Sequence, residues 1–364
     1  MSRSPSSPPI RILVVDDSAA SRELLMGVLN GHPGLDVVGT AVDGETALRQ
    51  AQRLQPDVIT MDIHMPGIDG FATTRLIMER CPTRVVMVTA TSFPSEVAAS
   101  FHALECGALT VIGKPLGPGH PQFAAAADEL VRTVMLMAEV HVVKRWPSAG
   151  RTLPPAAVTT ATSTAASTAA LPAAQADRGA RLIAIGASTG GPIVLQDILS
   201  RLRPGLGAPV LIVQHISTGF TAGFVQWLAQ TTGFNVRQAA HGDIVQPAVA
   251  YVAPDGKHMA IQAGGRIVLS EEPPEYGLRP SVASLFRSAA AAYGPRAIGV
   301  LLTGMGSDGA LELKAMREAG ALTLVQDAES AVIYGMPGQA VKLGAASHVL
   351  APEAIAATLN RWVP

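Results

Sequence analysis

The sequence predicts an α/β protein built from two separate parallel sheets, and three observations support this. Short apolar runs alternate with helical stretches on both sides of a segment of unusual composition. That segment, at about residues 146–180, is rich in Pro, Ala, Thr and Ser and has too few large apolar residues to form a core. Many of the apolar runs end in polar or charged residues, which is typical of parallel strands whose carboxyl ends form a site. We therefore expect two α/β units joined by a tether.

Composition limits the classes of function. A chain of 364 residues favours two to three domains of about 150 residues, and 48% hydrophobic with 15% charged residues suits a globular α/β protein. The net charge of −1 lacks the basic excess that broad nucleic-acid binding requires. Only two cysteines and no signal peptide are present, so we expect a reduced, cytoplasmic protein. No apolar run approaches the roughly 20 residues that span a bilayer, and no direct membrane insertion is expected.

We expect four segments along the chain. Residues 1–9 form a disordered Ser/Pro tail, and residues 10–128 form the first α/β domain. Residues 129–180 contain a helical extension and the linker, and residues 181–364 form the second domain.

In the first domain, four strands are expected to end in residues that suit one pocket. The expected strands are 10–15, 57–61, 84–88 and 109–112, with a helix over about 18–29. They lead into Asp16 and Asp17, Asp62, Thr89, and Lys114, respectively.

The three carboxylates predict a phosphorylation site. Asp16, Asp17 and Asp62 would repel one another unless a divalent cation lay among them, and hard oxygen ligands suit Mg²⁺. Asp62 could then attack a phosphoryl donor, while Lys114 and the Thr89 hydroxyl hold the phosphoryl oxygens. For any single aspartate, the alternative is a solvated acidic turn or a helix N-cap.

These residues resemble the receiver domain of two-component response regulators over roughly residues 10–128. The matching stretches are Asp16-Asp17, Asp62 with Met65-Pro66 and Asp69-Gly70, Thr89-Ala90, and Lys114-Pro115. The resemblance implies a flavodoxin-like, five-stranded parallel sheet that is phosphorylated on Asp62 with Mg²⁺ bound. Receivers often carry an aromatic switch residue three positions before the lysine, where this chain has Val111.

In the second domain, three strands are expected to lead into candidate catalytic residues. Runs at 182–185, 210–213 and 297–302 precede Ser188, His215 and Asp308. Carboxyl ends of parallel strands meet at one edge of a sheet, so these side chains could converge as nucleophile, base and orienting carboxylate. The pattern predicts a serine hydrolase that catalyses acyl transfer.

Each residue alone has another interpretation. The turn Gly186-Ala187-Ser188-Thr189-Gly190 fits a G-x-S-x-G elbow, but a Gly-rich turn can also hold a nucleotide phosphate. The full G-x-G-x-x-G spacing is absent, which weakens that alternative. His215 could be structural, and Asp308 could cap a helix at 310–318.

His258 could line a substrate groove, although a solvated turn is favoured. A metal hydrolase is disfavoured because no H-E-x-x-H or Cys-pair pattern is present.

Nearly the whole chain resembles the chemotaxis response regulator protein-glutamate methylesterase/glutamine deamidase family, known as CheB. The most specific stretches are residues 185–191, Gln214-His215, 251–254, 279–282, 302–306, 308–310 and 334–337. The resemblance implies a doubly wound, mostly parallel catalytic domain with Ser188 as nucleophile, His215 as general base and Asp308 as its partner. Backbone N–H groups near Thr189 and Met305 would form the oxyanion hole. No cofactor is expected for the esterase chemistry.

The resemblance also implies partners and regulation. Family members hydrolyse glutamate γ-methyl esters on chemoreceptor cytoplasmic helices and often deamidate glutamines there. We expect a chemotaxis-type histidine kinase as phosphodonor and an unphosphorylated receiver that packs over the triad. Two other functions compete: a response regulator with a DNA-binding output domain, and a catalytically silent scaffold on the same fold.

Overall fold

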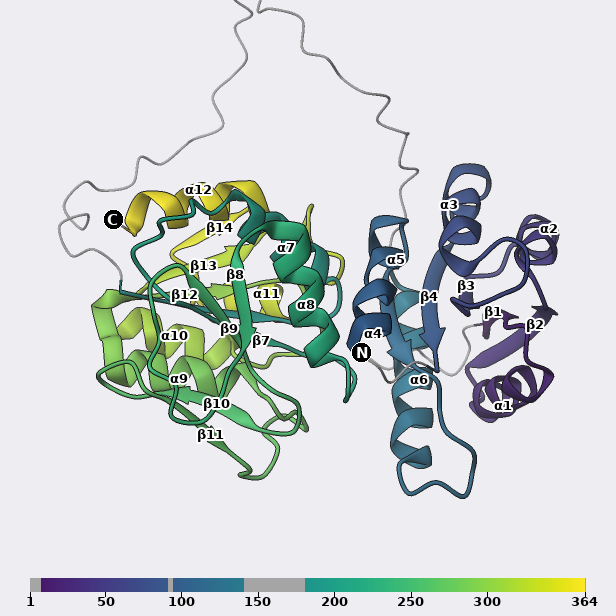
Figure 1. Cartoon of the computed structure of the whole chain (residues 1–364), viewed down its shortest axis with the longest axis horizontal. Coiled ribbons are helices and arrows are strands. Elements are labelled where there is room, and N and C mark those ends of the chain that lie inside the picture. Colours follow the sequence, from purple (N-terminus) through teal and green to yellow (C-terminus); the bar gives the residue numbers. More distant parts are fainter. Residues whose placement is uncertain (1–7, 91–93, 141–180, 364) are drawn as a thin grey trace, which may run out of the picture.

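The computed structural model of the chain describes residues 8–90, 94–140 and 181–363. Two α/β units lie side by side, one at each end of the long axis (Figure 1). Most of the expected N-terminal tail and the expected linker at 146–180 lie outside the described residues.

The first unit is a five-stranded parallel sheet, as the resemblance to receiver domains implies, and its strand order is β2-β1-β3-β4-β5. Its strands are β1 (Ile10–Val15), β2 (Leu35–Ala41), β3 (Val58–Met61), β4 (Arg84–Thr89) and β5 (Thr110–Gly113). Its helices are α1 (Ala19–Asn30), α2 (Gly44–Leu54), α3 (Gly70–Arg80), α4 (Pro94–Ser100), α5 (His102–Glu105) and α6 (Phe123–Met137).

Helices cover both faces of this sheet. Apolar residues of α1 and α6 share one buried cluster with β1, while those of α2, α3 and α5 join a second cluster on the other face. Helix α1 begins one residue later than predicted because Ser18 is its N-cap, whose hydroxyl accepts a hydrogen bond from the N–H of Ser21. Helix α6 runs across the expected boundary between residues 128 and 129, and its buried Leu130, Val134 and Met137 attach it to the first unit.

The second unit is a doubly wound, seven-stranded parallel sheet in the order β14-β13-β12-β6-β7-β9-β8. Its strands are β6 (Leu182–Ala187), β7 (Val210–Gln214), β8 (Asn235–Gln238), β9 (Val249–Val252), β12 (Ala297–Leu301), β13 (Leu322–Gln326) and β14 (His348–Leu350). A separate antiparallel ribbon consists of β10 (His258–Ile261) and β11 (Ile267–Ser270). The helices are α7 (Gly191–Arg201), α8 (Thr221–Thr232), α9 (Val282–Tyr293), α10 (Ala310–Glu318), α11 (Met336–Lys342) and α12 (Pro352–Trp362), with a short 3₁₀ turn at Gly294–Arg296.

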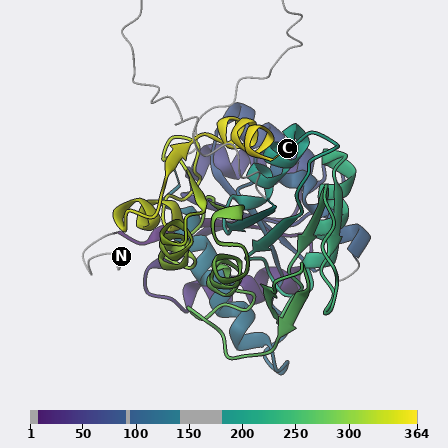
Figure 2. The same cartoon turned by 90° about the vertical axis from the view of Figure 1, so that its left-hand side faces the viewer.

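The second sheet lies between two layers of helices, which Figure 2 shows from the side of this unit. Helices α7, α8 and α12 contribute to one apolar cluster, and α9, α10 and α11 contribute to another.

The chain reverses its winding direction at β6, which pairs with β7 on one side and β12 on the other. In the first sheet, β1 has the same place between β2 and β3. Parallel α/β sheets bind ligands at such switch points, so β6 and β1 mark the expected sites.

The two units share one continuous apolar cluster. Phe101, between α4 and α5, packs against Phe224 and Trp227 of α8, with ring centroids 5.4 Å away in both cases. Helices α4 and α8 approach so closely that a Cβ on Gly223 would lie 2.5 Å from the Cβ of Val97. The two units therefore contact each other through a packed core (Figure 1).

The glycine at residue 186 allows α9 to pack against β6. A Cβ there would lie 2.3 Å from Cγ1 of the fully buried Val282, so we expect Gly186→Ala to destabilise the fold by about 1–3 kcal/mol. Thermal unfolding should show a Tm several degrees lower. The control is Gly205→Ala, where the added methyl meets open space and the Tm should stay within about 1 °C of wild type. An unchanged Tm for Gly186→Ala would contradict this packing.

Candidate functional site

Ser188 lies in a tight turn between a buried strand and a helix. Strand β6 ends at Ala187, and α7 begins at Gly191. The N–H of Ser188 donates to the carbonyl of Thr303, at 3.0 Å. The left-handed backbone of the turn is at Gly190, where φ is 79°, so glycine rather than the serine adopts the unfavourable conformation. This is the strand–turn–helix elbow that the sequence predicts.

His215 is bonded to Asp308, which is held in turn by the first turn of α9. The Nε2 of His215 lies 2.9 Å from Oδ2 of Asp308. The carboxylate, which is 1% exposed, also accepts hydrogen bonds from the N–H groups of Val282 and Ala283, at 2.7 and 2.9 Å. These donors satisfy a buried charge at a helix N-terminus. The alternative that Asp308 caps the helix at 310–318 is wrong, because Gly309 is the N-cap of α10.

The three predicted catalytic residues line one cavity of about 610 Å³. Since Asp308 takes Nε2 of His215, the ring nitrogen left for a nucleophile is Nδ1. Among the described residues, the Ser188 hydroxyl has no hydrogen-bond partner, as is common for a nucleophile before substrate binds. The geometry therefore places an oriented imidazole and an uncommitted hydroxyl in one cavity.

Thr189 and Met305 line the same cavity. Neither backbone N–H is hydrogen bonded to any atom of the residues that the structure describes. The Thr189 N–H shares its peptide plane with the carbonyl of Ser188. That carbonyl accepts hydrogen bonds from Nε2 of Gln214 and from the N–H of Gly191, at 2.9 and 2.8 Å, which hold the peptide in place. Two free N–H groups at one cavity are what stabilisation of an oxyanion requires.

Gln214 links the turn of the nucleophile to the turn of the base. Its side-chain amide Nε2 donates to the carbonyls of Ser188 and His215, at 2.9 and 2.7 Å. The side chain is buried. Since both facing groups are carbonyl acceptors, the NH₂ group rather than the oxygen of the amide must point toward them. The sequence shows a Gln-His pair here, but only the structure shows this brace.

His258 differs from the sequence-based expectation. The favoured solvated turn is wrong, because His258 begins β10 and is only 1% exposed. Its Nδ1 accepts the N–H of Ser281, and its Nε2 lies 3.2 Å from the carbonyl of Pro273. It does not line the cavity around Ser188. His258 instead supports Ser281, the N-cap of α9.

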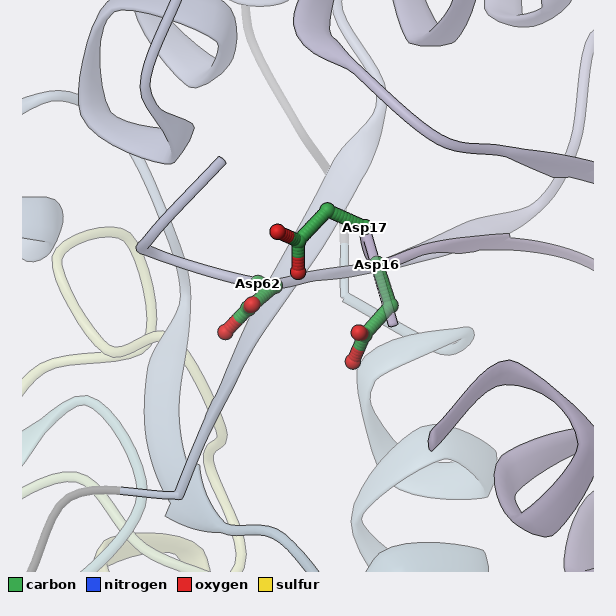
Figure 3. A group of neighbouring side chains, drawn as sticks. All are labelled: Asp16, Asp17 and Asp62. Atoms are coloured by element: carbon green, nitrogen blue, oxygen red, sulfur yellow. The ribbon is translucent and has the colours of Figure 1, made fainter. Parts of the chain in front are cut away.

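A second site lies at the carboxyl edge of the first sheet. Asp16, Asp17 and Asp62 each place a carboxylate oxygen within 4.8 Å of the others (Figure 3). The Lys114 ammonium lies 2.7 Å from Asp16 and 3.1 Å from Asp62. Burial raises the pKa of Asp62 above its ordinary value, although Lys114 opposes this shift. The predicted phosphorylation residues are thus brought together.

The donor set at this edge fits Mg²⁺. Three clustered carboxylates are hard oxygen ligands, and the exposed Asp17 leaves room for water ligands. Thr89 lies at the end of β4, where its carbonyl accepts the N–H of Lys114 at 2.8 Å. Val111, at the position of the usual aromatic switch residue, is buried in the shared apolar cluster.

Comparisons with known proteins agree with both halves of the chain. A family model described as CheB methylesterase matches residues 183–359, and one described as response regulator receiver domain matches residues 12–122. A protein-glutamate methylesterase/protein-glutamine glutaminase of Geobacter metallireducens is 51% identical over 96% of this chain and 98% of its own length. The chain belongs to the CheB methylesterase family. A second member, from Syntrophus aciditrophicus, is 46% identical over 96% of this chain and 97% of its own.

Solved structures of the family match each half separately. The catalytic domain of Thermotoga maritima CheB is 33% identical, with 50% of this chain and 99% of that one covered and a TM-score of 0.49. The receiver domain from the same organism is 41% identical, with 36% and 98% covered and a TM-score of 0.34. Among the described residues, no helix has the length and apolar character to cross a bilayer.

The brace made by Gln214 predicts a specific defect. In Gln214→Glu, a carboxylate would face two carbonyl oxygens, so the two turns should separate, and labelling of Ser188 by a fluorophosphonate should slow about 100-fold. Gln214→Met removes the donor without repulsion and should slow labelling about 10-fold. Gln230→Met, an exposed glutamine of α8, is the matched control. Labelling of Gln214→Glu at the wild-type rate would show that the brace has no part in aligning the site.

Proposed function

We propose that this chain hydrolyses glutamate γ-methyl esters on methyl-accepting chemoreceptor cytoplasmic domains, releasing methanol, and deamidates specific glutamines there. The observation that carries the proposal is the His215–Asp308 pair held at the N-terminus of α9, beside Ser188 in one cavity. Relatives that match nearly the whole chain are named protein-glutamate methylesterase/protein-glutamine glutaminase. Adaptation in chemotaxis-type signalling is the corresponding role, and the cytoplasm is the corresponding compartment.

The proposed chemistry is acyl transfer through Ser188. His215 removes the hydroxyl proton through Nδ1 as the serine oxygen attacks the ester carbonyl. The N–H groups of Thr189 and Met305 stabilise the resulting oxyanion. On collapse, His215 returns the proton to the leaving methoxide, and methanol departs from a γ-glutamyl ester of Ser188. Asp308 orients the imidazole and stabilises its charged form in both transfers.

The second half of the reaction regenerates the serine. His215 takes a proton from water, which attacks the acyl-enzyme carbonyl. On collapse, His215 gives that proton to the departing Oγ of Ser188, and the glutamate carboxylate is released. With a glutamine substrate, the same steps release ammonia in place of methanol, because both substrates give one acyl-enzyme. One site therefore accounts for both proposed activities.

The first unit is the proposed phosphoryl acceptor. Asp62 is the nucleophile toward a chemotaxis-type histidine kinase, and Asp16, Asp17 and Asp62 would hold Mg²⁺. The ion supplies charge neutralisation during phosphoryl transfer. Lys114 is the proposed partner of the phosphoryl oxygens after transfer, and its contacts with Asp16 and Asp62 support this role. The Thr89 hydroxyl is the second proposed phosphoryl contact.

Phosphorylation is proposed to uncover the active site. The cavity that contains Ser188 is also lined by Leu109, Glu129 and Arg132 of the receiver. A smaller cavity, of about 310 Å³, is lined by Thr89, Lys114 and Phe220, and so extends from the acceptor site toward the domain interface. Phosphorylation adds nearly two negative charges beside Lys114, and a change of a few kcal/mol would shift the docked population.

Methanol release tests the enzymatic half. Wild type should release methanol from methylated chemoreceptor fragments, and a small-molecule phosphodonor with Mg²⁺ should accelerate release. Ser188→Ala should lower the rate by at least about 1,000-fold. Asp62→Ala should keep the basal rate and lose the acceleration. Absence of release under every condition would refute the proposed reaction.

A hydrogen bond between the units tests the regulatory half. The Glu129 carboxylate of α6 accepts from the hydroxyl of Ser217, two residues after His215, at 2.6 Å. Glu129→Ala removes this charge-assisted contact, so basal methanol release without phosphodonor should rise about 3- to 10-fold. Asp128→Ala, an exposed carboxylate one position away on the same helix, should leave the basal rate unchanged. If the basal rate of Glu129→Ala equals the rates of wild type and of Asp128→Ala, the docked state is not inhibitory.

A further inference from the structure

A hairpin turn at the edge of the catalytic cavity has an unfavourable backbone. The N–H of Glu275 donates to the carbonyl of Leu278 at 3.1 Å, and the reverse bond is 2.8 Å long. The two central residues, Tyr276 and Gly277, have φ values of 53° and 75°. Positive φ at both central positions defines a type I′ turn, which favours Asn, Asp or Gly.

Tyrosine is a poor residue for the first central position of this turn. For an L-residue with a Cβ atom, the left-handed backbone conformation costs about 1 kcal/mol or more of conformational free energy. Burial of the ring contributes little stabilisation to offset this cost, because Tyr276 is 52% exposed. The turn is nevertheless held in place, since Glu275 forms an ion pair with Arg287 of α9 at 2.5 Å. Local stability therefore does not explain the choice of tyrosine, and unfavourable conformations of this kind concentrate at functional sites.

The turn lies at the active site. Tyr276, Gly277 and Leu278 line the cavity that contains Ser188, as does Met305, which is 41% exposed. An exposed ring and an exposed thioether thus border the cavity into which an ester must enter. A glutamate side chain is short, so a helix that places its ester at Ser188 must bring its own surface against these residues.

We infer that Tyr276 is a specificity-determining residue, whose ring packs against the substrate helix beside the reacting glutamate or glutamine. This inference rests on the proposed function. The residues that meet the ring are the helical neighbours three and four positions from the reacting residue, because those share one face with it.

The surroundings of the ring define which neighbours are accepted. Partial desolvation of its hydroxyl raises the pKa of the half-exposed Tyr276 above its ordinary value, and the carboxylates of Glu312, Asp308 and Glu275 act in the same direction, opposed by Arg287. Burial likewise raises the pKa of Glu312, and its Oε2 is buried without a hydrogen-bond partner among the described residues. An aromatic ring in an acidic environment favours apolar or basic neighbours and repels acidic ones. We expect esters flanked by acidic residues at these positions to be poor substrates.

Kinetics on helical peptides test this assignment. The full-length protein is used with Mg²⁺, both without phosphodonor and with phosphodonor at saturation. Each peptide carries one glutamate γ-methyl ester with Ala, Lys or Glu at the positions three and four residues away. The variants are Tyr276→Ala, Tyr276→Asn and Tyr276→Phe, with Ile244→Ala as the control. Ile244 is a similarly exposed apolar residue, 50% exposed, that does not line the cavity. Fluorophosphonate labelling reports the reactivity of Ser188 without a peptide.

We expect Tyr276→Ala and Tyr276→Asn to raise the KM for the Ala peptide at least fivefold, with wild-type labelling rates. Asn suits the left-handed turn, so Tyr276→Asn should keep or raise the Tm, which separates loss of the ring from loss of the turn. Tyr276→Phe and Ile244→Ala should keep the wild-type KM within twofold. Wild type should discriminate against the Glu peptide, and Tyr276→Ala should lose part of that discrimination.

Two results would overturn the inference alone. In the first, wild type hydrolyses the peptides through Ser188, but Tyr276→Ala and Tyr276→Asn keep its KM. In the second, these variants change only the dependence on phosphodonor, which would make Tyr276 a contact with the receiver. Failure of wild type to hydrolyse any peptide, with normal labelling of Ser188, would instead overturn the proposed function and this inference with it.

Discussion

The arrangement of the catalytic unit depends on the buried carboxylate of Asp308. It accepts hydrogen bonds from two N–H groups of α9 and contacts His215, so it fixes a helix and the imidazole together. The first turn of α9 can approach only because Gly186 and Gly309 have no side chains. A Cβ at either position would lie 2.3 or 2.4 Å from Val282. Two glycines far apart in sequence thus make room for the helix that holds this buried carboxylate in place.

Both sites follow from the same property of parallel sheets. The aspartates of the receiver follow strands at its switch point, and Ser188 follows the strand at which the second sheet reverses direction. The sheets are joined through α4, α8 and the rings of Phe101 and Trp227, in one apolar cluster. The interface is therefore packed like a core, while the polar contact between Glu129 and Ser217 lies nearer the active site. A packed interface of this kind favours discrete docked states over continuous sliding.

Local patterns predicted much of this structure. The apolar runs before Ser188, His215 and Asp308 are strands, and each residue lies where the alternation of strands and helices predicts. Strand β2 has no clear signal in the sequence, because its partly exposed residues give no continuous apolar run. The local pattern at His258 is misleading, because Asp-Gly-Lys before it is typical of a solvated turn, whereas the packing of β10 buries the histidine.

The sequence by itself determined the two α/β units, the residues that line both candidate sites and the family. These depend on residue types at fixed distances from buried strands, and such local relations are readable along the chain. Only the tertiary structure decided which ring nitrogen of His215 meets Asp308, what Gln214 bridges, and that Tyr276 borders the cavity. Those facts depend on contacts between segments separated by tens of residues, whose relative orientation is set by the packing of the complete core.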